Sequence, residues 1–244
     1  MAALGMAGAY DRAITVFSPQ GRLYQVEYAL ETVKSGSTSV GLRVNEGVIL
    51  AVEEKTHSKL QSPLYSQKLF QIDEHIGAAA SGLISDARVL VDSARIYAQV
   101  FRLSYDEPPS VETIAKRIGD TMQLYTQHAG VRPFGVALLI GGVSADGPRL
   151  FYTEPSGVVV EYLAWGIGRG AEKVKEFFEN NYSSDISLDD AKKMAIKSLI
   201  YSVDKLDENW TAKLVSIPSD TRKYTIEPQS EVEKIVKKIL EERK

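Results

Sequence analysis

Cysteine is absent from the 244 residues, which excludes disulfide bonds, thiolate catalysis and cysteine-ligated zinc. The only histidines are His57, His75 and His128, and no two of them share a helix face at ligand spacing. The short apolar opening meets Asp11 and Arg12 with no basic residue ahead of it, and no run approaches the ~20 apolar residues of a membrane span. We therefore expect a cytoplasmic protein without a metal or cofactor.

An excess of charge of either sign is also lacking. Lys and Arg number 29 against 32 Asp and Glu, so no overall basic field attracts nucleic acid or an anionic membrane. Hydrophobic residues make up 44% of the chain, an ordinary globular composition. No linker rich in Gly, Pro or Ser divides the sequence. We expect one domain over residues 1–244.

The first periodic segment is SPQGRLYQVEYALETVKSG, which begins at Ser18. Ser18 suits a helix cap, Pro19 suits the first helical position, and Gly36 suits the exit. Apolar residues recur at spacings of three and four, which predicts a helix over 18–35 with one buried stripe. That stripe contains Leu23, Val26, Leu30 and Val33. Residues 1–11 are expected to precede the helix as a flexible tail.

The remaining elements are expected in blocks. Four strands follow the helix, then two helices, three strands, two helices, a hairpin and a last helix. VVVEYLAWG at 158–166 is expected to be one strand. Caps are expected at Ser110, Ser187 and Ser230. Strands in blocks and helices in pairs predict largely antiparallel sheets in an α+β fold, two sheets face to face between helical layers.

The segment WGIGRGAEKV offers a possible nucleotide site. Gly166, Gly168 and Ala171 match a dinucleotide fingerprint between a strand and a helix. That motif needs a parallel strand directly after its helix, and here a second helix is expected instead. A tight strand-to-helix turn is the favoured interpretation, and nucleotide binding remains an alternative.

Ser37 and Thr38 stand at the head of the first strand. Such a hydroxyl can act as a nucleophile when its own α-amino group is free to serve as the base. The preceding residues would have to be removed first, but they include an amphipathic helix that should dock on the body. The favoured interpretation is therefore that Ser37 and Thr38 are not catalytic. The alternative is a Ser-type N-terminal-nucleophile hydrolase processed at Gly36–Ser37.

The N-terminal block AYDRAITVFSPQGRLYQVEYALETVKSGST resembles the signature of α subunits of the 20S proteasome core, archaeal ones in particular. QKLFQID, SGLISDARVLVDSAR, QHAGVRPFGVALLIGG and PRLFYTEPSG match the same family further along the chain. Catalytic β subunits lack the leading helix. The resemblance implies the four-layer αββα sandwich of N-terminal-nucleophile hydrolases, with an extra N-terminal helix.

The resemblance also implies a non-catalytic subunit, which has no catalytic residues of its own. In the alignment with β subunits, Ser37 falls at the N-terminal threonine, Glu53 at an aspartate, Lys68 at the catalytic lysine and Arg169 at an active-site serine. The implied partners are other α subunits in a seven-membered ring, β subunits, unfolded protein substrates and an activating AAA ATPase. No nucleic acid or membrane partner is implied.

The family's gate maps to five residues of this sequence. They are Tyr10, Asp11, Arg12, Pro19 and Tyr28. These residues would anchor the tail, so that tails converging on the ring axis can settle in either of two arrangements.

The family's pocket for the C-terminal tail of the ATPase maps to Lys68, Gly36, Gly82 and Leu23. A lysine suits capture of a terminal carboxylate, and small residues let a peptide backbone approach closely. By spacing alone, Lys68 would be interpreted as an ordinary surface lysine, and only the resemblance favours the pocket.

Overall fold

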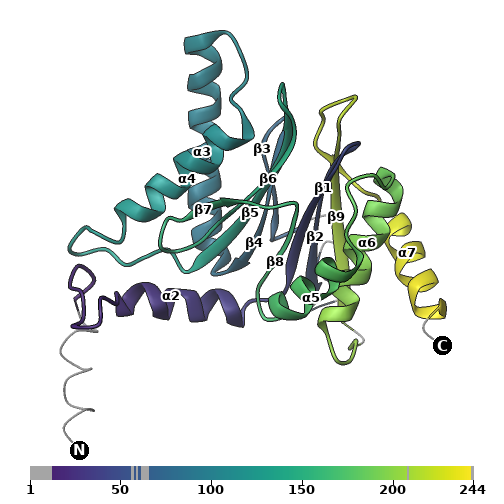
Figure 1. The fold of residues 1–244 in the computed structure, drawn as a ribbon, viewed down its shortest axis with the longest axis horizontal. Helices are drawn as coiled ribbons and strands as arrows, with labels where there is room; N and C mark the ends of the chain where they lie inside the picture. The colour runs from purple at the N-terminus through teal and green to yellow at the C-terminus, as the bar shows by residue number, and fades with distance from the viewer. Residues whose placement is uncertain (1–12, 56–57, 59, 62–65, 208, 243–244) are drawn as a thin grey trace, which may run out of the picture.

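Two antiparallel sheets of five strands face each other, and helices cover the outer face of each sheet (Figure 1). This computed structural model describes residues 13–55, 58, 60–61, 66–207 and 209–242. The arrangement confirms the predicted four-layer α+β sandwich. Between the sheets, a layer of apolar side chains includes Val48, Leu50, Leu139 and Leu150, all fully buried.

The first sheet has the strand order β10-β9-β2-β1-β8. Its strands are β1 (Ser39–Val44), β2 (Gly47–Lys55), β8 (Ala164–Ile167), β9 (Trp210–Pro218) and β10 (Thr225–Ile226). Along β1 the alternation sends Val40 and Leu42 into the core beneath the covering helices, whereas Gly41 faces the other sheet. Those helices are α5 (Ala171–Asn181), α6 (Leu188–Ser202) and α7 (Gln229–Glu242).

The second sheet has the order β3-β4-β5-β6-β7. Its strands are β3 (Leu69–Asp73), β4 (Ile76–Gly82), β5 (Val136–Ser144), β6 (Gly147–Thr153) and β7 (Val159–Glu161). Helices α3 (Ile84–Tyr105) and α4 (Val111–Leu124) cover its outer face and project beyond the strands (Figure 1). The stripe expected on α4, including Val111, Ile114, Ile118 and Met122, is buried against this sheet.

Helix α2 (Tyr24–Ser35) crosses one end of the sandwich, along the bottom of Figure 1. The predicted start at Ser18 is wrong. Ser18 instead closes a turn, in which its amide donates to the Arg22 carbonyl and Gly21 adopts φ +75°. Because Gly21 has this left-handed backbone conformation, helical geometry does not extend back from Tyr24 to Ser18. Pro19 lies in the turn. Of the predicted stripe, Val26 and Val33 are buried, whereas Leu30 and Leu23 are only half-buried and Leu23 precedes the first turn of the helix.

Two further expectations need correction. The run at 158–166 is not one strand, because β7 pairs with β6 in one sheet and β8 pairs with β1 in the other. Ser230 does not cap the last helix, which already begins at Gln229. Ser110 and Ser187 do cap their helices, each accepting a backbone N–H three residues on. Within the described ranges, no helix is both long and apolar enough to cross a bilayer.

Candidate functional site

Lys68 lies inside the fold, next to the head of β1. It is 5% exposed, and its ammonium donates to the carbonyl oxygens of Ser37 at 2.8 Å, Thr38 at 3.1 Å and Glu53 at 3.1 Å. The ammonium also donates to Ser37 Oγ at 2.9 Å. Four oxygens share three N–H groups, so the internal acceptors already occupy every donor. Burial lowers the pKa of Lys68 to about 7.

Glu53 and Arg169 form an ion pair beside this lysine. The Glu53 side chain is 1% exposed, accepts the Thr38 backbone N–H at 3.1 Å and pairs with the Arg169 guanidinium. Arg169 is 43% exposed and stands in the turn between β8 and α5. The structure thus brings together Ser37, Glu53, Lys68 and Arg169, the four residues that the resemblance predicts to align with the active site of β subunits.

A hydroxyl and an amine in contact are the parts of a nucleophile and its base. In this chain the Ser37 nitrogen follows Gly36 in a peptide bond, and α2 continues upstream of it. Gly168, at φ +95°, brings the backbone close: a Cβ there would lie 2.7 Å from the Ser37 carbonyl oxygen and 2.9 Å from that of Gly36. Ser81 Oγ donates to the same Ser37 oxygen at 2.9 Å. The head of β1 is therefore enclosed by neighbouring backbone.

Three of the four residues predicted for the activator pocket come together. A Cβ on Gly36 would lie 2.5 Å from the Gly82 backbone nitrogen, and Lys68 contacts the residue after Gly36. Leu23 lies at the other end of α2, which is 12 residues or about 18 Å long. One chain therefore brings Lys68, Gly36 and Gly82 together and holds Leu23 a helix length away.

The residues predicted for the gate are only partly visible. Tyr10, Asp11 and Arg12 lie outside the described residues. Pro19 is exposed in the turn before α2, and Tyr28 is 51% exposed on the helix, stacked on Tyr24 with ring centroids 6.5 Å apart. Tyr28 also lines a shallow hollow of about 210 Å³ between α2 and the segment of Arg132 and Pro133.

The glycines at 166–170 serve packing. A Cβ on Gly166 would lie 2.5 Å from Val174, and one on Gly170 would lie 2.6 Å from Ser202. The strand that follows α5 and α6 is β9, which runs antiparallel to β2. The strand-to-helix turn is therefore the correct interpretation, and the nucleotide fingerprint is wrong.

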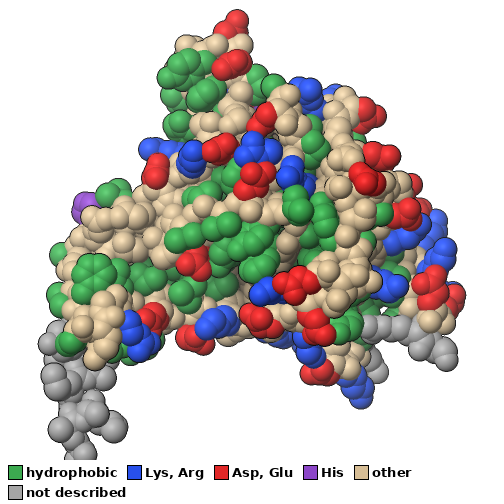
Figure 2. Space-filling model, in the orientation of Figure 1, with side chains coloured by type: hydrophobic (Ala, Val, Ile, Leu, Met, Phe, Trp, Pro, Cys, Tyr) green, Lys and Arg blue, Asp and Glu red, His purple; other side chains and the backbone are tan. Residues whose placement is uncertain are grey.

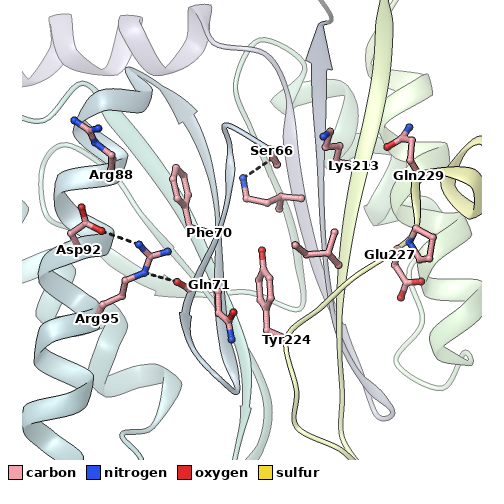
Figure 3. Close-up of a pocket in the computed structure, with 13 residues that line it drawn as sticks. Ser66, Phe70, Gln71, Arg88, Asp92, Arg95, Lys213, Tyr224, Glu227 and Gln229 are labelled. Carbon is pink, nitrogen blue, oxygen red and sulfur yellow. Dashed lines mark hydrogen bonds and ion pairs between the residues drawn. The ribbon is translucent and has the colours of Figure 1, made fainter. Parts of the chain in front are cut away.

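Sequence reasoning missed a cleft of about 530 Å³ at one edge of the sandwich (Figure 3). Phe70 from β3 and Tyr224 from the segment before β10 form its apolar centre, and Arg88, Asp92 and Arg95 of α3 flank it. Burial raises the pKa of the Tyr224 hydroxyl. The residues that line the cleft come from both sheets and from α3, so no local sequence motif predicts the cleft. Among the described residues, no group of acidic and histidine side chains is placed to hold a metal.

Comparisons with known proteins all indicate the family of proteasome subunits. The chain matches the family described as proteasome subunit over residues 33–217, and the N-terminal signature of the proteasome A-type subunits over residues 10–31. It is 48% identical to the proteasome alpha subunit of Methanothermobacter thermautotrophicus over 231 residues, 95% of this chain and 93% of the relative. The protein of the same name in Methanosarcina acetivorans is 49% identical, covering 96% and 95%. That of Methanopyrus kandleri is 54% identical over 78% of each chain.

Proposed function

Since the chain belongs to the proteasome subunit family and is of the alpha type, we propose that it gates the entry of unfolded proteins and docks an ATPase activator. The alpha subunit is a non-catalytic component of the outer ring of the 20S core particle, which degrades proteins. The alternative of a hydrolase processed at Gly36–Ser37 is therefore wrong. The observation that supports the proposal is helix α2. It packs across the end of the sandwich at which a processed hydrolase would expose its nucleophile.

The proposed assembly is a seven-membered ring of alpha subunits stacked on beta subunits in the cytoplasm. Exposed apolar side chains at the projecting end of α3 support an interface there (Figure 2). Leu103 is 87% exposed and Tyr105 is 66% exposed, and both lie in the last turn of the helix. Clustered apolar surface of this kind marks contacts between proteins.

The gate is proposed to consist of the N-terminal tail with Tyr10, Asp11, Arg12, Pro19 and Tyr28. Deleting residues 2–11 should raise peptide hydrolysis by particles assembled with beta subunits, because the tails would no longer obstruct the pore. The measurement is the initial rate on a short fluorogenic peptide. A matched control replaces residues 2–11 with a Gly-Ser segment of equal length, which keeps the bulk but removes the sequence. Unchanged hydrolysis after deletion would count against a gating tail.

The activator pocket is proposed to form around Lys68, Gly36 and Gly82, with Leu23 at its far side. Because α2 is about 18 Å long, a tail that touches both Lys68 and Leu23 of one chain needs about five or six extended residues. A shorter tail would require Leu23 from an adjacent copy.

Lys68→Ala should abolish stimulation of peptide hydrolysis by the ATPase while leaving rings intact in electron micrographs. Lys34→Ala is the control, because Lys34 is an exposed lysine at the same end of α2. Normal stimulation of the Lys68 variant would refute the pocket, whereas equal loss in both variants would indicate a general charge effect.

A further inference from the structure

Lys68 is a buried cation with neutral contacts. Its ammonium touches three backbone carbonyl oxygens and one hydroxyl, and within the described part of the chain no ion pair joins it to a carboxylate. Buried charges are ordinarily paired, because removing an ion from water is costly. An added negative charge nearby would therefore stabilise the Lys68 ammonium.

Two carboxylates lie close enough to act on Lys68, both from β2, and each has other partners. Glu53 pairs with Arg169 and accepts the Thr38 N–H. Glu54 accepts Ser66 Oγ at 2.5 Å and the Gln67 N–H at 3.0 Å. Among the described residues, Arg169 is the other charged group that acts on Lys68, and it opposes the ammonium.

Arg169 is the one charged partner in the described residues that pairs with the Glu53 carboxylate, which also accepts the Thr38 N–H. Lys68 already donates to the main-chain oxygen of Glu53, so the side chain of the same residue needs only a new rotamer to approach the ammonium. The guanidinium of Arg169 and the Thr38 N–H hold that carboxylate away from hydrogen-bond contact with the ammonium. Without Arg169, Glu53 would be a buried carboxylate beside a buried ammonium, and the two would pair.

We propose that Arg169 is a positioning residue, which engages Glu53 and so leaves the Lys68 ammonium without an internal counter-charge, so that an incoming terminal carboxylate can displace one of its four neutral acceptors. This inference rests on the proposed activator pocket and adds a residue to it. The bound carboxylate takes the place that Glu53 would otherwise occupy. Arg169 acts through Glu53 and is not itself required to touch the tail.

The proposal has a signature in proton uptake. The pKa of Lys68 is about 7 in the unbound chain, and a bound carboxylate stabilises the ammonium and raises that pKa. Between the free and bound values, binding takes up a proton. The affinity is therefore highest below pH 7 and falls by up to about tenfold per pH unit above it.

The test measures binding to assembled alpha rings by calorimetry between pH 6.5 and 8.5. The probe is the C-terminal heptapeptide of the ATPase that stimulates the particle, either as the free acid or as the C-terminal amide. Wild-type rings should bind the acid with proton uptake and with the predicted pH dependence, and the amide should show neither.

In Arg169→Ser rings, Glu53 should occupy Lys68. If that pairing is present at about nine sites of ten, the affinity for the acid falls about tenfold at pH 6.5. The pH dependence should also flatten, because pairing with Glu53 raises the pKa of Lys68 in the free ring. Arg169→Lys should retain the wild-type profile, and the double variant Arg169→Ser with Glu53→Gln should restore it.

The two proposals fail in different ways. If wild-type rings bind acid and amide equally, the pocket at Lys68 is wrong. If wild-type rings prefer the acid but Arg169→Ser keeps the same pH profile, the pocket stands and the positioning role is wrong. A loss that the double variant does not restore would also overturn the positioning role, since it would show general damage to the site. Arg88→Gln, a change at an exposed arginine of α3, should leave binding unaltered.

Discussion

Two charged clusters lie near the same helix, α2, and differ in how their buried charge is balanced. Asp86 receives two hydrogen bonds from Arg132, at 2.6 and 2.9 Å, and one from the Gly135 N–H at 2.9 Å. Lys68, near the C-terminal end of α2, meets only neutral oxygens. The first cluster is complete within the chain, whereas the second lacks a counter-charge that a partner could supply.

The pKa values of the two groups reflect the same difference. Burial alone would raise the pKa of Asp86, but the hydrogen bonds from Arg132 and Gly135 outweigh it and lower the pKa. Burial lowers the pKa of Lys68, and the nearby carboxylates do not offset that effect. A structural ion pair stabilises its charge internally, whereas a binding site can leave its charge to be stabilised by the ligand.

The largest expected effect is at Gly82, which lies between the clusters. Its φ is +112°, and a Cβ would lie 2.3 Å from the Gly135 carbonyl oxygen, so Gly82→Ala forces the backbone of both clusters apart. We expect the free energy of unfolding in urea to fall by more than about 3 kcal/mol. Gly147→Ala is the control, because Gly147 has φ +98° but nothing within 4 Å, and should cost about 1 kcal/mol. Equal losses would show that backbone angle, and not the close approach, determines the effect.

The next effect tests the completed cluster. Asp86→Ala leaves the Gly135 N–H and the Arg132 guanidinium without their acceptor. Because Arg132 is 61% exposed and can return to water, we expect a loss of only about 2 kcal/mol in the free energy of unfolding. Asp92→Ala removes an exposed pair with Arg95 on the same helix and should change stability by less than about 0.5 kcal/mol. Similar values for the two variants would contradict the distinction between a buried and a surface pair.

The smallest effect distinguishes the clusters by pH. The folded pKa of Lys68, about 7, lies below its unfolded value of roughly 10.4, so the unfolded chain holds more protons between them. The Lys68 contribution to stability should therefore rise with pH above 7, by up to about 1.4 kcal/mol per unit. The Asp86 contribution has the same sign, because its pKa is also lowered, but it changes in acid and is lost as pH falls through that lowered pKa.

Urea unfolding at pH 7 and 8 measures the Lys68 contribution. Lys68→Met should abolish the rise, and Lys34→Met, a change at an exposed lysine, should keep it. If the free energy of unfolding of Lys68→Met still rises between pH 7 and 8, another titratable group is responsible for the rise.

Local pattern predicts most of the elements correctly. The stripes of α2 and α4 and the caps at Ser110 and Ser187 depend on neighbours within a few residues, which periodicity detects. The errors arise where distant partners decide. The run at 158–166 has continuous strand character, yet it changes sheet because β6 and β1 each pair with a different half of it. The predicted start of α2 is too early because Ser18 and Pro19 also suit a turn.

In the candidate site, too, some features follow from the sequence and others depend on partners that are distant in the chain. Resemblance to the family selects Lys68, Gly36 and Gly82, and the fold brings them together. Nothing in the sequence around Lys68 indicates that it is buried, since its four acceptors come from residues 15 to 31 positions away. The cleft at Phe70 and Tyr224 escapes sequence reasoning for the same reason.

By itself, the sequence determined the alpha-type signature, the order of the elements apart from the division of 158–166 into two strands, and the exclusion of thiol chemistry, because residue identities along the chain carry them directly. Only the tertiary structure decided which carboxylate Arg169 engages and that Lys68 has neutral contacts. Burial and pairing depend on the three-dimensional distance between charges in a medium of low polarity, and chain separation does not encode that distance.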